Sequence, residues 1–214
     1  MNVLAVGAHH DDIELGCGGT LARLARDGHA TFGVTLTNSE THYDLRAIHR
    51  TREQAVAEAR KAASVIGLTL VELEGAGRDN GTLGYDVELM RRLEQVIAER
   101  QISLVFSHWR LDLNTDHEAA ARMTIVAARH VPSVLMYRSN WYQAASPFNG
   151  TCFVDISDVI DRKRACLACY ETEIGNRTPA WIESFIDAHR SAGFGVGRTY
   201  AEVFEPVRFE LLQR

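Results

Sequence analysis

The chain has 214 residues, 46% hydrophobic and 24% charged, a composition typical of a globular protein and not of a disordered or collagen-like chain. Lysine and arginine number 23 against 28 aspartates and glutamates, so the formal net charge is −5. The sequence has no block of basic residues, which disfavours a nucleic-acid partner. No stretch approaches the roughly 20 apolar residues of a membrane span. We therefore predict one domain over residues 1–214, without nucleic-acid binding or membrane insertion.

The apolar run at residues 3–8 is too short for the core of a signal peptide, and no basic segment precedes it. A cytoplasmic location is therefore expected, where reducing conditions disfavour disulfides. Cys166 and Cys169 form a C-x-x-C pair, but no second pair completes a four-cysteine metal site. We interpret this pair as ordinary side chains of a helix. The sequence leaves homo-oligomerisation open.

Strand and helix patterns alternate along most of the chain. In chain order we predict a strand at residues 3–6, a helix at 18–28, a strand at 31–37, a helix at 46–66, a strand at 68–73, a helix at 86–100, a strand at 103–107, a helix at 118–129 and a strand at 133–137. After a loop at 141–150 we predict a strand at 151–156, helices at 157–170 and 179–188, and a glycine-rich loop near the site at 191–198. The alternation predicts an α/β fold with a Rossmann-like, doubly wound, mostly parallel sheet flanked by helices. The remaining segment is expected to form a C-terminal extension that closes over the site.

Two polar clusters follow predicted strands, where open α/β sheets bind their ligands. Residues 9–14 read H-H-D-D-I-E directly after the first strand, and residues 108–117 follow the strand at 103–107. One histidine and one carboxylate from the first cluster, with one histidine from the second, would give a three-ligand metal site with open positions, as catalytic sites have. Zn²⁺ suits such a set best, and Fe²⁺ shares it.

The two clusters resemble the signatures of a known family. Residues 8–19 read A-H-H-D-D-I-E-L-G-C-G-G and resemble A-H-P-D-D-E-x-x-G-x-G-G, a signature of the LmbE/PIG-L N-deacetylases. This family includes the deacetylases of glucosaminyl-phosphatidylinositol, mycothiol and bacillithiol biosynthesis. Residues 112–117 read D-L-N-T-D-H and resemble its second signature, H-P-D-H. The resemblance implies that His9, Asp12 and His117 bind zinc, that Asp11 is the general base, and that Asp116 orients its histidine partners.

Two positions depart from the family signatures. His10 stands where the usual residue is proline, and Asn114 stands where many members have the first histidine of H-P-D-H. That histidine commonly acts as an acid or stabilises the oxyanion, whereas asparagine can donate a hydrogen bond but transfers no proton. Either Asp11 carries the proton both ways or another group, such as His108, acts as the acid. We favour the Asp11 shuttle.

The resemblance also implies contacts to the substrate. It places Arg50 where the family often contacts a phosphate or a sugar hydroxyl, and Asp79 where an acidic residue of the family holds sugar hydroxyls. Glu40 stands where the family often has an acid near the site. The predicted function is a zinc-dependent hydrolase that removes the N-acetyl group of a small amino-sugar conjugate of the N-acetylglucosamine type. The alternatives are an amidase for a larger acyl group, or a non-catalytic Rossmann-like protein that binds a sugar or nucleotide. A non-haem iron oxygenase would share the ligands, but the βα alternation disfavours its usual fold.

Overall fold

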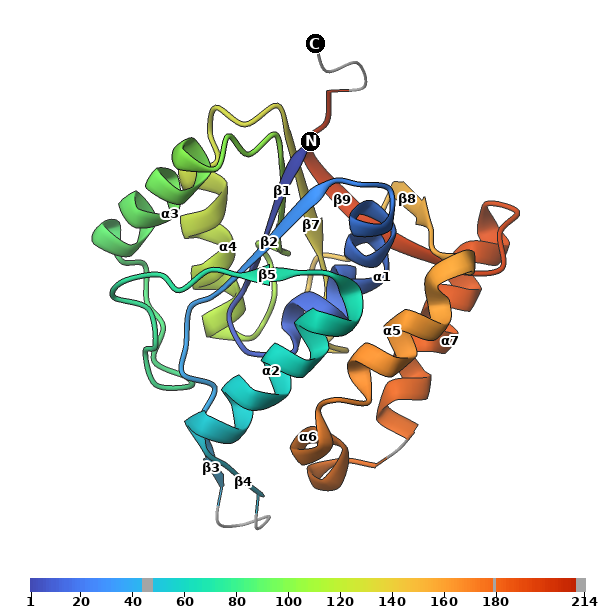
Figure 1. The fold of residues 1–214 in the computed structure, drawn as a ribbon, viewed down its shortest axis with the longest axis horizontal. Coiled ribbons are helices and arrows are strands. Elements are labelled where there is room, and N and C mark those ends of the chain that lie inside the picture. Colours follow the sequence, from blue (N-terminus) through green and yellow to red (C-terminus); the bar gives the residue numbers. More distant parts are fainter. Residues whose placement is uncertain (44–47, 179, 211–214) are drawn as a thin grey trace.

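A computed structural model describes residues 1–43, 48–178 and 180–210, and in them a seven-stranded sheet lies between two layers of helices (Figure 1). The strand order is β5-β2-β1-β6-β7-β9-β8, and the first five strands run parallel. The last two pair antiparallel, β9 with both β7 and β8. The strands are β1 (Asn2–Gly7), β2 (Ala30–Thr35), β5 (Thr69–Leu70), β6 (Leu104–His108), β7 (Ser133–Tyr137), β8 (Cys152–Asp155) and β9 (Ala201–Arg208).

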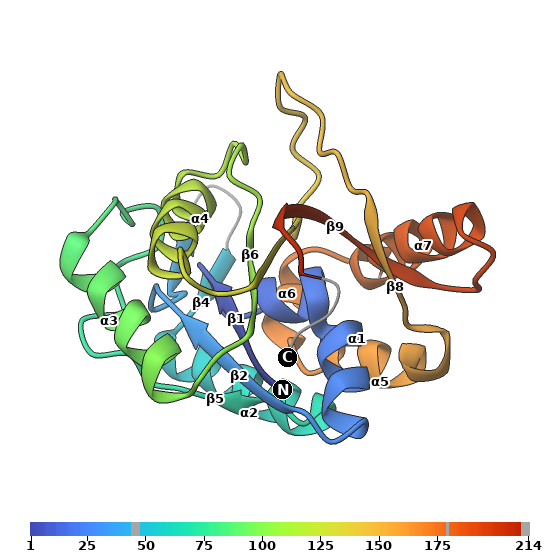
Figure 2. The same cartoon turned by 90° about the horizontal axis from the view of Figure 1, so that it is seen from above.

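The helices cover both faces of the sheet. Figure 2 shows α3 (Val87–Glu99) and α4 (Thr115–Ala127) on one side, with α1 (Asp12–Arg26), α5 (Ile160–Leu167) and α7 (Ala180–Gly195) on the other. The second layer also holds α2 (Arg52–Ile66) and α6 (Glu171–Asn176), and the 3₁₀ turn η2 (Ser157–Val159) precedes α5. A separate hairpin of β3 (Thr41–Tyr43) and β4 (Ile48–Arg50) extends beyond the start of α2. In the described part of the chain, no helix is both long and apolar enough to cross a membrane.

Each face of the sheet has its own apolar core. Along β1, Val3 and Ala5 belong to the core under α1 and α2, whereas Leu4 and Val6 belong to the core under α3 and α4. This alternation is what a strand covered on both faces requires. All four side chains are fully buried, so β1 is the centre around which the two layers pack.

A glycine brings the first helix close to the sheet. A Cβ atom added to Gly16 would lie 2.0 Å from the ring of Tyr137 on β7. The hydroxyl of Tyr137 donates a hydrogen bond to the carbonyl of Val6 at 2.8 Å, and this bond fixes the ring between α1 and β1. The N-terminus of α1 therefore lies directly at the carboxyl ends of β1 and β7.

The prediction of a mostly parallel, doubly wound sheet with flanking helices is confirmed. Three local predictions were wrong. The first helix begins at Asp12 instead of residue 18, and β4 occupies part of the helix predicted from residue 46, whose first two residues lie outside the described ones. The glycine-rich loop expected at 191–198 is largely the end of α7, which continues to Gly195 because Gly193 packs against the backbone of Tyr200, only 2.7 Å from the position of a Cβ. The last strand, β9, and the helix α6 were not predicted.

Candidate metal centre

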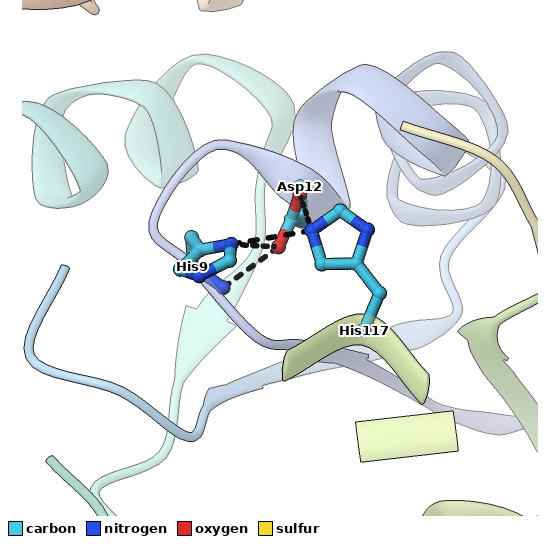
Figure 3. Close-up of side chains that lie close together, drawn as sticks. All are labelled: His9, Asp12 and His117. Carbon is cyan, nitrogen blue, oxygen red and sulfur yellow. Dashed lines mark hydrogen bonds and ion pairs between the residues drawn. The ribbon is translucent and has the colours of Figure 1, made fainter. Parts of the chain in front are cut away.

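Three side chains meet at the carboxyl ends of β1 and β6. His9 lies in the turn after β1, Asp12 is the first residue of α1, and His117 lies in the first turn of α4 (Figure 3). His9 Nδ1 is 3.2 Å from Asp12 Oδ2, and His117 Nε2 is 3.3 Å from Asp12 Oδ1. The two ring nitrogens, His9 Nδ1 and His117 Nε2, are 3.2 Å from each other. The structure thus brings together the three residues expected to bind a metal.

Carboxylates hold the outward-facing nitrogen of each histidine. His9 Nε2 lies 3.0 Å from Asp116 Oδ2, and His117 Nδ1 lies 3.1 Å from Asp112 Oδ2. A carboxylate only accepts hydrogen bonds, so these outer nitrogens carry the protons and the inner ones, when the rings are neutral, carry lone pairs. Asp116 also accepts the backbone N–H groups of Gly81 and Leu83, as a fixed orienting group should.

Two members of this arrangement were missed by the sequence analysis. Asp112 holds His117, and the amide of Asn140 donates to both oxygens of Asp112 at 2.9 and 2.8 Å. Asp112 lies in the second polar cluster, five residues before His117, and this position was its only signal. Asn140 follows β7 and belongs to no motif, so only the fold places it here.

The donor set fits a divalent cation. Two imidazole nitrogens and one carboxylate oxygen are ligands that zinc prefers, and the carboxylates behind the histidines are the partners that metal-bound histidines commonly have. Asp12 is held in turn by Ser139, whose hydroxyl donates to Oδ1 at 2.8 Å. A second group, His108, Asp112 and His117, also has its ligand atoms close together, and it shares His117 with the first.

The charges of the site favour a positive group between the ligands. Burial by itself lowers the pKa of His9, but the negative charge of Asp12 and the hydrogen bond to Asp116 raise it to about 10. The pKa of His117 rises to about 9, because the charge of Asp12 and the bond to Asp112 outweigh burial. The neighbouring histidines hold the pKa of Asp12 well below its usual range although the carboxyl is buried.

Asp11 lies beside the ligands and lines the same cavity. Its backbone has φ 145°, a conformation that residues other than glycine rarely adopt, and its side chain does not cap the helix that it precedes. The residue is only 7% exposed. Burial and the nearby charge of Asp12 raise the pKa of Asp11 well above its usual range. A cation bound by Asp12 would offset that negative charge and lower the pKa again.

His108 and Asn114 support the ligands from two sides. His108 is fully buried and lies outside the cavity, where its Nε2 accepts the N–H of Ala8 at 3.0 Å and lies 3.2 Å from Asp12 Oδ2. Burial and the neighbouring His117 lower the pKa of His108 to about 4. Asn114 does line the cavity, and its Oδ1 caps α4 by accepting the N–H of Asp116 at 2.9 Å.

The cavity in front of the ligands has a volume of about 820 Å³. Of the residues expected to contact substrate, Glu40 and Arg50 line it, whereas Asp79 lies outside and accepts a hydrogen bond from Asn38 at 2.8 Å. The side chain of Arg50 is buried against two carboxylates. Other lining residues come from the C-terminal part of the chain, in keeping with the expected extension over the site: Ser139, Asn140, Trp141, Tyr142, Glu173, Asn176, Arg177 and Trp181.

A family profile, a related sequence and several solved structures match this chain. The profile described as PIG-L, GlcNAc-PI de-N-acetylase, matches residues 4–128. The uncharacterized deacetylase YaiS of Escherichia coli (strain K12) is 31% identical over 147 residues, which are 65% of this chain and 75% of that protein. The crystal structure of a conserved protein of Thermus thermophilus is 27% identical with a TM-score of 0.76, over 99% of this chain and 98% of that one. GalB, the 4-carboxy-2-hydroxymuconate hydratase of Pseudomonas putida KT2440, has a TM-score of 0.79 over 100% of this chain and 98% of that one, but at 22% identity this likeness concerns the fold alone.

Proposed function

The chain belongs to the PIG-L family of de-N-acetylases, and on this premise we propose that it is a zinc-dependent hydrolase of a small N-acetylated amino sugar. The N-acetylglucosamine type is the proposed substrate, and acetate and a free amine are the products. The observation that carries the proposal is the convergence of His9, Asp12 and His117, with Asp11 beside them, on one cavity of about 820 Å³. The family name and the deacetylase relative support the reaction type.

The residues around the ligands prepare them for a metal. His9, Asp12 and His117 would hold zinc, which when bound lowers the pKa of water toward ~7 and polarises the amide carbonyl. When the rings are neutral, Asp116 and Asp112 keep the histidine protons on the outer ring nitrogens, so the inner nitrogens have lone pairs for the metal. His108 acts on Asp12 from behind and does not reach the substrate space.

Asp11 moves the proton in both halves of the reaction. Its carboxylate takes a proton from the attacking water and then gives it to the nitrogen of the leaving amine, so no second acid is needed. This assignment follows from the position of the other candidates. His108 is fully buried outside the cavity, and Asn114 carries no transferable proton. We assign Asn114 to capping α4, which carries His117, and Glu40 to contact with the substrate at the cavity wall.

The experiment measures acetate release from a panel of N-acetylglucosamine glycosides. The protein is tested as purified, after chelation and after zinc is restored, and Asp11→Asn is tested beside it. Asp27→Asn, which changes an exposed carboxyl at the far end of α1, is the matched control. We expect activity that chelation abolishes, zinc restores and Asp11→Asn reduces by at least about 100-fold, the lower range for loss of a general base.

Each other outcome contradicts a stated part of the proposal. Release of longer acyl groups in preference to acetate would show an amidase of wider acyl range. Stoichiometric zinc without release from any N-acyl sugar would favour a protein that only binds its ligand. No zinc bound under any condition would remove the assigned roles of His9, Asp12 and His117.

A further inference from the structure

The turn that carries Asp11 is held by hydrogen bonds to its backbone. The N–H of His10 donates to Ser39 Oγ at 2.8 Å, and the carbonyl of His10 accepts Arg50 Nη2 at 3.1 Å. The carbonyl of Asp11 accepts the N–H of Leu15 at 2.9 Å. The proline usual at position 10 of the family signature has no N–H, so the bond to Ser39 requires a residue other than proline there, here His10. These contacts surround the one residue of the turn with a strained φ.

Arg50 is fixed from several sides. Its side chain is 2% exposed, with Nη1 at 3.1 Å from Glu173 Oε1 and Nη2 at 3.2 Å from Glu58 Oε2. The guanidinium carbon lies 5.6 Å from the centre of the Tyr170 ring. Two carboxylates next to one guanidinium leave little positive charge for an anionic substrate. This environment differs from that of an arginine poised to bind a phosphate group from solvent.

The two carboxylates are themselves anchored in different helices. Glu58 of α2 accepts the N–H of Thr172 at 2.8 Å and its hydroxyl at 2.7 Å. Glu173 of α6 accepts Nε of Arg177 at 3.0 Å. The network therefore connects α2 and α6 through Arg50 of β4 to the carbonyl next to Asp11.

We propose that Arg50 is a positioning residue, which fixes the Asp11 turn through the carbonyl of His10, and that it does not bind the substrate. This inference rests on the proposed function, in which Asp11 carries the proton. A guanidinium presents its N–H groups in a fixed planar fork, so it can hold the carbonyl and both carboxylates at once. A misplacement of about 1 Å at a reacting group can lower the rate 100-fold, so a small shift of the turn is sufficient to affect the reaction.

The test compares kcat with KM, because loss of a positioning residue lowers kcat whereas loss of a substrate contact raises KM. Arg50→Lys keeps the charge but loses the fork. We expect kcat to fall at least about tenfold and KM to change less than about threefold. The same loss should be seen with a neutral N-acetylglucosaminide and with N-acetylglucosamine phosphate. A rise in KM at unchanged kcat, or a loss confined to the phosphorylated substrate, would show a substrate contact and overturn the proposal.

Two further variants keep the test valid if Arg50→Lys fails to fold. Glu58→Gln lies outside the cavity and keeps the shape of the side chain, so a fall in kcat there cannot come from a lost substrate contact. We expect a smaller fall than in Arg50→Lys, and an unchanged kcat would contradict the network. Arg52→Lys, an exposed arginine two residues along the chain, is the matched control and should leave both constants unchanged.

A measurement without substrate distinguishes failure of this inference from failure of the proposed function. In hydrogen–deuterium exchange, the peptide covering residues 7–15 should exchange faster in Arg50→Lys than in the unmodified protein. The peptide covering β6 should not change. If the first peptide is equally protected in both proteins, the positioning role is wrong whatever the activity. If it loosens while no N-acyl sugar is hydrolysed by either protein, only the proposed reaction fails.

Discussion

The cavity has two walls that differ in how firmly their side chains are held. On the metal wall, His9, Asp12 and His117 are 14%, 4% and 4% exposed, and each ligand is held by a second side chain. On the wall that follows β7, Trp141 and Tyr142 are 45% and 55% exposed. Chemistry requires fixed distances, whereas recognition of a substrate body tolerates side chains that adapt. If the proposed function is correct, catalysis belongs to the first wall and substrate preference to the second.

The largest expected effect is that of pH on zinc affinity, and it tests whether His9 and His117 are protonated in the metal-free protein. The pKa values of about 10 for His9 and about 9 for His117 leave both rings protonated at pH 7 in the metal-free protein, so zinc must displace up to two protons. Apparent zinc affinity should therefore rise with pH, by up to about 100-fold per unit near neutrality. Calorimetry in buffers of different ionisation enthalpy measures the protons released. Heats that do not depend on the buffer would contradict the protonated rings.

The same pKa shifts predict the stability of the metal-free protein. Histidines with raised pKa values stabilise the folded state below their unfolded pKa of about 6.5, and this contribution is lost as the pH rises through about 9 to 10. The melting temperature of the chelated protein should thus decrease between about pH 6.5 and about pH 10. Saturating zinc should weaken the dependence, because the bound rings are already neutral.

A smaller effect is expected when one support of the metal wall is removed. Asp112→Asn replaces an acceptor by an amide that can also donate, so the proton of His117 is no longer confined to Nδ1. We expect zinc affinity or kcat/KM to fall about 10- to 100-fold, the usual effect of losing a partner of a metal-bound histidine. Competition with a chelator and steady-state kinetics measure the two quantities. Asp187→Asn, an exposed carboxyl on α7, is the control, and equal values for both variants would exclude the orienting role.

The smallest effect is expected on the other wall. Trp141→Ala removes an aromatic ring that lines the cavity and packs 4.8 Å from the ring of Phe185. We expect KM to rise about 2- to 10-fold, as the loss of one aromatic contact predicts, while kcat and zinc content stay the same. Phe194→Ala, exposed on α7 outside the cavity, serves as the control. A fall in kcat at unchanged KM would show that the two walls do not divide their tasks in this way.

The fold was predictable where local patterns decide it. β1, β6 and β7 are continuous apolar runs, and the polar clusters at their ends are where a parallel sheet gathers its ligands. The end of α7 was not predictable, because glycines favour a loop locally and the helix continues only through tertiary packing of Gly193. The strand β9 was missed for a related reason, since its place in the sheet is decided by pairing with β7 and β8, which lie far from it in the sequence.

The candidate site was predictable in its residues but not in the directions of its side chains. The resemblance of the two motifs to the family signatures predicted which residues would meet, and His9, Asp12 and His117 do. Motifs cannot show which way a side chain points, and the final residue of β6, His108, therefore looked available for catalysis although it lies behind Asp12. Arg50 was expected to contact the substrate, and its partners Glu58 and Glu173 were not foreseen, because they belong to two helices that no motif connects.

The parallel pairing of β1 with β6 has a consequence for how the molecule folds. Val3 to Ala5 pair with residues 104–106, so the ligands at the two strand ends come from positions 9 and 117. During synthesis, His9 and Asp12 cannot meet His117 until more than half of the chain has been made. Contacts between such distant residues form slowly, because a long loop has to close first. A metal ion bound at the end of that process would link the two ends of the loop, and its binding would report that β1 and β6 have paired.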